Sequence, residues 1–367
     1  MRRIGVLLVS LIVLLGGCSG TASSPAPSRS PSPSPSLAAW PIIGHWRAAA
    51  LTRSKPGLVV TEAVSTRRSS VVVLGRDGAV RATLWRSPDR IVHFDCDPAA
   101  GEIVATLLGP YEATGYRYQI VLLSADGTVR RVTDGMALGW EALPSPLLLR
   151  DGSVLWQRMR LVAERELYSP WYAERNGTPQ PVHIVGHLPR GFALSSLLPL
   201  AGRRTVALVD VRRTGAVALA HWSAGRLAVA DRPYVRKFAF WILDDPPGGA
   251  LPSTDALVVQ GYAPGEQVRV VRWVDGKPTS ALVLSKLPPE PRGGDATPFV
   301  LPGPAGYVLL YGWWPGQAAV NQGTDASDAS VTDAPVRLLL VNLRTGAVTR
   351  SRFVLPPSVT GSWQWLP

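Results

Sequence analysis

The chain has 367 residues, of which 46% are hydrophobic and 17% charged, and it contains 35 glycines and 34 prolines. This balance excludes a chain that is disordered throughout, and the abundance of turn-forming residues favours an all-β fold. The two cysteines, Cys18 and Cys96, lie in dissimilar surroundings, which excludes a disulfide-stapled scaffold. The formal net charge of +12 would favour anionic polymers or lipid headgroups as partners.

The N-terminus has the pattern of a secretory leader. Arg2 and Arg3 precede an apolar run, Ile4–Leu15, which is shorter than the roughly 20 residues that cross a bilayer as a helix. The run ends in Leu-Gly-Gly-Cys, which resembles the lipobox of bacterial lipoproteins. The resemblance implies that Cys18 becomes the first residue and carries the lipid; an ordinary leader with a chance cysteine is the alternative. We therefore predict a signal peptide over residues 1–17 and a lipid-anchored location on the extracytoplasmic face of a bacterial cell membrane.

A segment rich in serine and proline follows the predicted lipid site. Residues 19–36 read SGTASSPAPSRSPSPSPS and offer almost nothing to bury. Such a composition is typical of a disordered spacer with polyproline character, although a recognition ligand is an alternative. We predict that residues 18–38 form a lipidated linker and that residues 39–367 form one globular domain.

We expect the domain to begin with a short apolar segment that packs on its surface, followed by a sheet that lacks one strand. The apolar segment Leu37–Leu51 predicts a short helix or irregular wrap that packs Trp40, Ile43 and Trp46 onto the domain. Strands are then expected at Gly57–Val64, Ser70–Leu74 and Ala79–Trp85. The aromatic run Ser362–Leu366 at the C-terminus is expected to supply a fourth strand to this first sheet, which would hide otherwise open edges.

Residues 85–134 predict one complete unit of four antiparallel strands. The strands are expected at Ile91–Phe94, Glu102–Leu108, Tyr118–Ser124 and Thr128–Val132, which are rich in β-branched, aromatic and aliphatic residues. Asp126-Gly127 would form the tight turn between the last two strands, because glycine adopts a positive φ at no steric cost.

Similar turn pairs recur along the chain. They are Asp77-Gly78, Asp126-Gly127, Asn176-Gly177, Ala224-Gly225, Asp275-Gly276 and Thr345-Gly346, at intervals of 49, 50, 48, 51 and 70 residues. The last interval contains an insertion, Gly316–Pro335. A period of about 50 residues suits one propeller blade. We predict a six-bladed β-propeller closed by pairing of the C-terminal strand with the N-terminal blade; a seven-bladed ring, two smaller propellers or another all-β fold are the alternatives.

One unit also resembles a known family. Ser87-Pro88-Asp89, the strand end Val121–Leu123, Ala125-Asp126-Gly127 and Val132-Thr133-Asp134 are similar to the repeats of TolB-like, WD40-like propellers. Arg90 replaces the usual glycine, and later units keep only the turn. The resemblance implies a six-bladed fold used mostly for binding, and it transfers no catalytic residue.

Few residues have side chains that could bind a metal ion or take part in catalysis. His93, Asp95 and Asp97 would share one face of a strand and could offer three metal ligands. The competing interpretation places Asp95 and Asp97 in an Asp-Pro turn and makes Cys96 a small buried residue. We predict no catalytic residue, no metal and no cofactor, and Cys18 is the single predicted modification site.

The other candidate site residues are better explained by a structural role than by a functional one. His183 and His187 lie across a predicted strand and turn, and Asp244-Asp245 precedes two prolines in a predicted loop. The acidic residues of Gly316–Pro335 do not follow a calcium-loop pattern. The 13 tryptophans could stack on sugars, especially Trp313-Trp314, but Trp85, Trp156, Trp222, Trp241 and Trp273 lie in or beside strands and favour core packing. His45 and His221 are isolated.

These observations favour a lipid-anchored propeller that holds a protein or a cell-envelope polymer. Two alternatives stay open. One is a propeller enzyme with a metal or cofactor in the central channel, and the other is a carbohydrate or cell-wall binding module. Nucleic acid is not an expected partner, because the predicted leader exports the chain.

Overall fold

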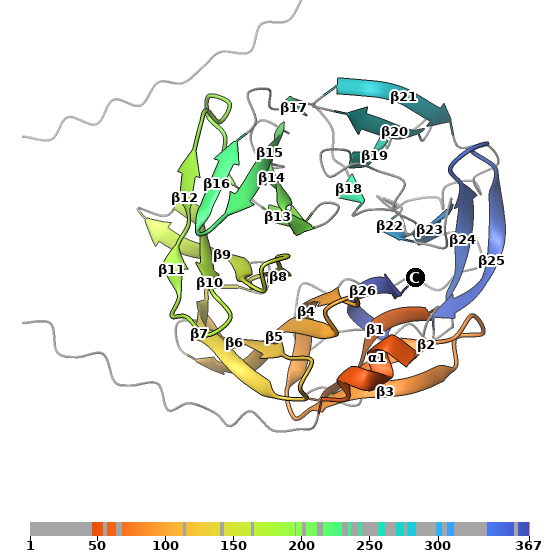
Figure 1. Cartoon of the computed structure of the whole chain (residues 1–367), viewed down its shortest axis with the longest axis horizontal. Coiled ribbons are helices and arrows are strands. Elements are labelled where there is room, and N and C mark those ends of the chain that lie inside the picture. Colours follow the sequence, from red (N-terminus) through yellow and green to blue (C-terminus); the bar gives the residue numbers. More distant parts are fainter. Residues whose placement is uncertain are drawn as a thin grey trace, which may run out of the picture. The chain divides into compact units, whose positions relative to one another are not determined.

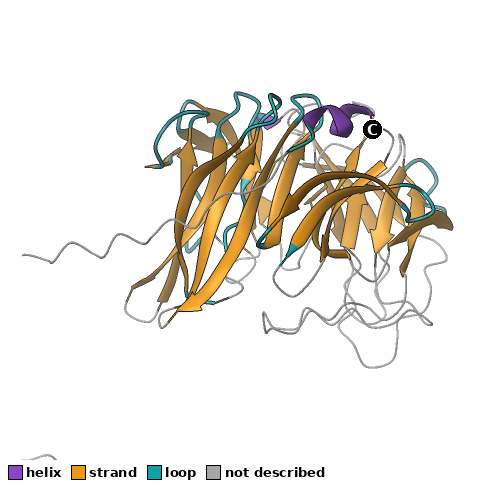
Figure 2. Ribbon diagram, turned by 90° about the horizontal axis from the view of Figure 1, so that it is seen from below, coloured by secondary structure: helices purple, strands orange, loops and turns teal. Residues whose placement is uncertain are grey.

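The structure is a computed structural model, and every residue it describes lies in one compact unit, Ile42–Pro367. The described residues are 46–53, 57–63, 68–112, 115–139, 143–162, 165–194, 196–199, 203–210, 216–229, 234–235, 242–243, 256–260, 269–274, 277–283, 299–302, 307–311, 336–355 and 359–366. The predicted leader, Cys18 and the serine- and proline-rich linker lie outside them. Figure 2 shows that the described ribbon is almost entirely strand, which confirms the all-β class.

Hydrogen bonding groups the described strands into six sheets, which we number I to VI in chain order. The strands of each sheet are given in their spatial order, starting from the inner strand (Figure 1). Sheet I contains β26 (Val359–Leu366), β1 (Gly57–Ala63), β2 (Ser69–Leu74) and β3 (Val80–Ser87) in that spatial order. Sheet II contains β4 (Arg90–Asp97), β5 (Glu102–Glu112), β6 (Gly115–Leu123) and β7 (Val129–Ala137). Sheet III contains β8 (Leu147–Leu148), β9 (Val154–Val162), β10 (Arg165–Ala173) and β11 (Gln180–Pro181).

The remaining three sheets follow the same pattern, with two additional strands in sheet IV. Sheet IV contains β13 (Ser196–Pro199), β14 (Thr205–Asp210), β15 (Ala216–Ser223), β16 (Arg226–Val229), β12 (His183–Val185) and β17 (Tyr234–Val235). Sheet V contains β18 (Ile242–Leu243), β19 (Ala256–Gln260), β20 (Arg269–Val274) and β21 (Lys277–Val283). Sheet VI contains β22 (Phe299–Pro302), β23 (Tyr307–Tyr311), β24 (Val336–Asn342) and β25 (Val348–Leu355). In sheet IV, β12 lies parallel to β16 and connects the outer edge of sheet III with that of sheet IV, and β17 pairs antiparallel with β15 beside the main strand order.

The first strand of each sheet in this order lies toward the middle of the view in Figure 1, and later strands lie further out. Successive sheets contact one another through these inner strands: β26 with β4, β4 with β8, β8 with β13, and β18 with β22. Strand β26 also contacts β22 and pairs antiparallel with β1, from Gly57 opposite Leu366 to Glu62 opposite Val359. The last strand of the chain therefore belongs to the same sheet as the first.

The turns between strands follow from local sequence. In the β6–β7 turn the carboxylate Oδ1 of Asp126 accepts hydrogen bonds from the backbone N–H and the hydroxyl of Thr128, at 2.9 and 2.7 Å. Gly127 then adopts a φ of +89°, which a side chain would strain. Gly78, Gly225 and Gly346 repeat this conformation in their own turns, whereas Asp275-Gly276 lies outside the described residues.

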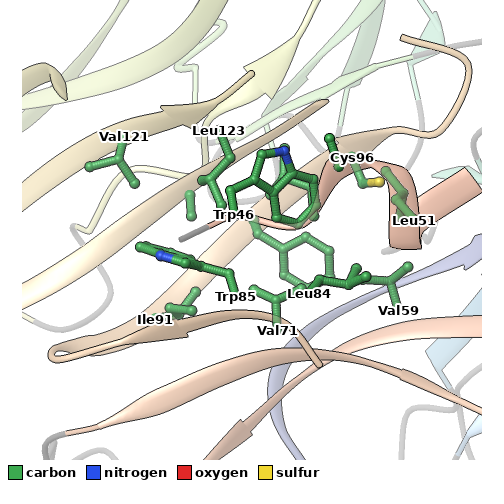
Figure 3. Close-up of a cluster of buried hydrophobic side chains, with 14 of the residues drawn as sticks. Trp46, Leu51, Val59, Val71, Leu84, Trp85, Ile91, Cys96, Val121 and Leu123 are labelled. Atoms are coloured by element: carbon green, nitrogen blue, oxygen red, sulfur yellow. The ribbon is translucent and has the colours of Figure 1, made fainter. Parts of the chain in front are cut away.

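The core consists of apolar clusters between neighbouring sheets. The cluster between sheets I and II joins Trp85 of β3 to Ile91 of β4 and also receives Trp46 and Leu51 from the helix segment (Figure 3). Trp156 lies in the cluster between sheets II and III, and Trp222 lies in the cluster between sheets III and IV. Trp85, Trp156 and Trp222 each fill space between sheets, as predicted for these positions, and Trp46 adds a second indole to the first cluster.

The predicted wrap is in part a helix. Helix α1 covers Ala48–Arg53, six residues, and it begins later than the predicted segment. Trp46 is buried as expected, and Trp40 and Ile43 lie outside the described residues. In the part of the chain that the structure describes, no helix has the length and apolarity needed to cross a membrane.

Candidate functional site

The strongest candidate set from the sequence lies on the inner strand β4. His93, Asp95 and Asp97 stand opposite Thr106, Val104 and Glu102 of β5, and this two-residue period places them on one face of the sheet. Asp97 closes the turn that follows, because its Oδ1 accepts the backbone N–H groups of Ala99 and Ala100 at 2.9 and 3.1 Å. The predicted role of Asp97 in an Asp-Pro turn therefore agrees with the structure.

Asp95 does not belong to that turn and instead forms a buried ion pair. Its Oδ2 lies 2.5 Å from Nη1 of Arg203, and its Oδ1 accepts from Nη2 of Arg203 at 3.1 Å. Asp95 also accepts the backbone N–H of Leu148 at 2.7 Å and that of Cys96 at 2.9 Å. The side chains of Asp95 and Arg203 are only 8% and 15% exposed, so these bonds replace water.

Arg203 extends this network over three sheets. Its guanidinium donates to the backbone carbonyls of Leu148 in sheet III and Cys96 in sheet II, while its own carbonyl accepts from the backbone N–H of Arg150. Arg203 follows β13 of sheet IV and adopts a φ of +54°, which is uncommon for a residue other than glycine. The surrounding bonds hold this conformation, so the Asp95–Arg203 pair acts as a pin between sheets II, III and IV.

Two further contacts join the same sheets near their turns. Nη2 of Arg175, in the β10–β11 turn, lies 2.7 Å from Oε1 of Glu102 at the start of β5. Burial raises the pKa of Glu102, and the charge of Arg175 opposes that rise. The indole Nε1 of Trp222 donates to Oδ2 of Asp151 at 2.7 Å. Polar groups at this end of sheets II to IV are therefore used to hold the sheets together.

His93 is the remaining member of the β4 set. Desolvation lowers its pKa to about 4, so the imidazole is neutral at physiological pH. Among the described residues, no group of three or more histidine, cysteine, aspartate or glutamate side chains is arranged to hold a metal ion. Since Arg203 and backbone N–H groups occupy the oxygens of Asp95, the geometry on β4 is that of a structural network.

The other sequence candidates are scattered. His183 in β12 and His187 after it are both exposed, with Gly186 between them at a φ of +104°. His221 is exposed, and its Nδ1 lies 3.0 Å from the hydroxyl of Thr205. Asp244-Asp245, Gly316–Pro335, Trp313-Trp314, Trp241 and His45 lie outside the described residues, as does the side chain of Trp273.

The structure adds a surface that the sequence did not reveal, at the opposite end of sheet II and on strands β9 and β10 of sheet III. Tyr111, near the end of β5, is 68% exposed, and its ring meets that of Tyr116 edge-on at a centroid distance of 4.9 Å. Tyr116 stands opposite Ala137 of β7, and Leu138, the next residue, is 49% exposed. Tyr116 packs against the cluster between sheets II and III, so this group lies at the margin of a rigid core.

Sheet III supplies the other side of this surface. The guanidinium carbon of Arg158 in β9 lies 5.0 Å from the ring centroid of Trp171 in β10, in a cation–π geometry. The indole Nε1 of Trp171 donates to the hydroxyl of Ser169 at 3.2 Å, and Leu167, which shares their face of β10, is 51% exposed. Trp171 packs against the same cluster as Tyr116.

Arg158 also lies near sheet II. Burial raises the pKa of Tyr118 in β6, and the positive charge of Arg158 opposes that rise. Tyr116 and Trp171 pack against the same cluster, so both groups border the space between sheets II and III. We name this set of residues the rim surface, and it consists of Tyr111, Tyr116, Leu138, Arg158, Leu167 and Trp171.

Comparisons with known proteins give no family. No family model matches the chain, and no curated protein matches it. The solved structures to which the chain is similar include the β-propeller domain of Cps50 (Swd1) from Myceliophteria thermophila, with 10% identity and a TM-score of 0.42 over 82% of this chain and 86% of that one. They also include KlAtg21 in complex with the coiled coil of AgAtg16, with 8% identity and a TM-score of 0.42 over 83% and 79%. Acylaminoacyl peptidase from Pyrococcus horikoshii has 13% identity and a TM-score of 0.40 over 83% of this chain and 47% of the enzyme.

Proposed function

We propose that the six sheets form the six blades of a β-propeller, with β26 closing the ring. The support is internal to the molecule. The described sheets follow one another in chain order, the inner strands of sheets I to IV contact in succession, as do those of sheets V and VI, and the last strand pairs with β1 while contacting both β22 and β4. A C-terminal strand in the first blade is the usual way in which such a ring removes its open edges.

We propose further that this propeller is a binding or scaffold protein, lipid-anchored through Cys18 on the extracytoplasmic face of the cell membrane, and that it holds a protein or envelope partner. The rim surface is the observation that carries the binding role. Exposed aromatic and aliphatic groups beside a stacked arginine are typical of protein-binding sites, and here they project from strands fixed by a buried core.

In-cell proximity labelling of the full-length chain tests this proposal. A labelling enzyme fused to the C-terminus should mark one set of envelope neighbours, and a variant with Tyr111→Ser and Leu138→Ser should lose that set. Val80→Ser is the matched control, because Val80 is an exposed apolar residue, 44% accessible, on β3 of sheet I.

The same neighbours in wild type and in the double variant would contradict the proposal that the rim surface holds the partner. Elemental analysis of the purified protein addresses the enzymatic alternative. A stoichiometric metal that is lost in His93→Ala would move the search to the inner strands, and binding to purified wall polymer would favour the carbohydrate alternative.

A further inference from the structure

Arg158 is the charged residue of the rim surface. One face of its guanidinium stacks on Trp171, and the residue is exposed. None of the ion pairs formed among the described residues includes Arg158. By contrast, Nε of the neighbouring Arg117 lies 3.5 Å from Oε1 of Glu112.

A stacked guanidinium has a specific chemical preference. Stacking fixes the plane of the group, while its N–H donors point outward in the fork that matches a carboxylate. Among the described residues, Glu112, next to Tyr111, pairs with Arg117, and Asp134 of β7 pairs with Arg131, so neither of these carboxylates forms an ion pair with Arg158. An anionic group on a partner would supply the missing complement.

The exposed apolar residues of the rim surface restrict the kind of ligand that could carry the anionic group. Tyr111 and Leu138 of sheet II and Leu167 of sheet III are each about half exposed or more. A small anion such as free phosphate would leave these groups in water. A polypeptide segment that alternates apolar and acidic side chains would cover the apolar groups and pair with Arg158 at once.

Resting on the binding role proposed above, we propose that the rim surface recognises an acidic, aliphatic or aromatic segment of a partner protein. A carboxylate of that segment pairs with Arg158, and an adjacent apolar side chain packs between Tyr111 and Leu138 of sheet II and Leu167 of sheet III.

The test uses phage-displayed random dodecapeptides selected on the purified, full-length propeller. Selected peptides should be enriched in aspartate or glutamate next to an aliphatic or aromatic residue. Synthetic copies should bind about 10- to 100-fold more weakly to Arg158→Glu, because the reversal removes a charge-assisted pair and adds repulsion. Arg76→Glu in the exposed β2–β3 turn makes the same change in net charge and should bind like wild type.

Three results would overturn the inference. They are a selection without acidic enrichment, equal losses in Arg158→Glu and Arg76→Glu, and binding that inorganic phosphate alone abolishes. Binding of phosphatidylglycerol vesicles that is lost in Arg158→Glu, without peptide selection, would also overturn it and would identify the rim surface as a membrane contact. Neighbours that depend on Tyr111 and Leu138 but not on Arg158 would retain the proposed function and reject this inference.

Discussion

Replacing Asp95 by alanine should destabilise the protein strongly. The change leaves the guanidinium of Arg203, 15% exposed, without its carboxylate, and it leaves the backbone N–H of Leu148 without an acceptor. Removing one partner of a buried pair costs about 3–5 kcal/mol, a large part of the roughly 5–15 kcal/mol that stabilises a typical domain. Urea unfolding followed by tryptophan fluorescence measures the difference, because Trp156 and Trp222 lie in the clusters on either side of sheet III.

The double variant Asp95→Leu with Arg203→Met separates two contributions to the loss of stability. One is the loss of the ion pair, and the other is the cost of a buried charge that has no partner. We expect the double variant to be more stable than Asp95→Ala yet about 1–3 kcal/mol less stable than wild type, because neither charge stays buried without a partner but the backbone N–H of Leu148 and the carbonyl of Cys96 lose theirs. Asp134→Ala is the surface control. Its carboxylate lies 3.4 Å from Nη1 of Arg131, but both side chains are more than a third exposed, so the loss should stay below about 1 kcal/mol. A loss below about 1 kcal/mol for Asp95→Ala would refute the role of this ion pair in joining the sheets, as would a double-variant loss equal to the sum of the losses in Asp95→Leu and Arg203→Met alone.

Three further measurements test other parts of the structure. Burial lowers the pKa of His93 to about 4, so it contributes stability above pH 6.5 that is lost as the pH falls toward 4, up to roughly 3 kcal/mol. In His93→Gln, urea unfolding across that window should show a shallower decline, and an unchanged decline would count against the burial. Gly115→Ala should cost about 1–3 kcal/mol in the same assay, since φ is +142° and the new Cβ would lie 2.2 Å from the carbonyl oxygen of Ala137; Gly139→Ala, with open space, should cost under about 0.5. Cys18→Ala should release the chain from the membrane fraction and remove the lipid mass from its N-terminus, and equal fractionation with wild type would reject lipid attachment at Cys18.

The features that the sequence predicts well are those set by neighbouring residues. Turns such as Asp126-Gly127 depend on one carboxylate and one positive φ, and strands such as β2 depend on a short apolar run. The all-β class follows from such local signals. The ring of six blades is a longer-range statement and stays part of the proposal, as do Cys18 and the domain boundaries.

The rim surface was missed for a local reason. Strand β5 was expected to end at Leu108, because Gly109-Pro110 usually terminates a strand. The structure continues to Glu112 by shifting the register between Leu108 and Tyr111, so that a bulge accommodates the two residues. The longer hairpin carries Tyr111 out of the core and exposes it.

The sequence did not predict the Asp95–Arg203 ion pair, because its two residues are far apart in the chain. Asp95 and Arg203 are 108 residues apart, and nothing beside Arg203 in the sequence marks it as the partner of a buried carboxylate. The positive φ of Arg203 is also hidden, because the usual indicator of that conformation is glycine or asparagine.

In sheet II the two networks lie at opposite ends of the same strands, and this separation has a consequence for function. In sheet II the register places Asp95 opposite Val104, near the start of β5, whereas Tyr111 lies seven residues further along that strand. Charges at the first end are used in pairs between sheets, and such pairs fix the angle at which neighbouring sheets meet. Because the rim surface takes one side from sheet II and the other from sheet III, its width depends on that angle. Side chains that bind nothing outside the molecule can thus hold the binding residues of two sheets at a constant spacing.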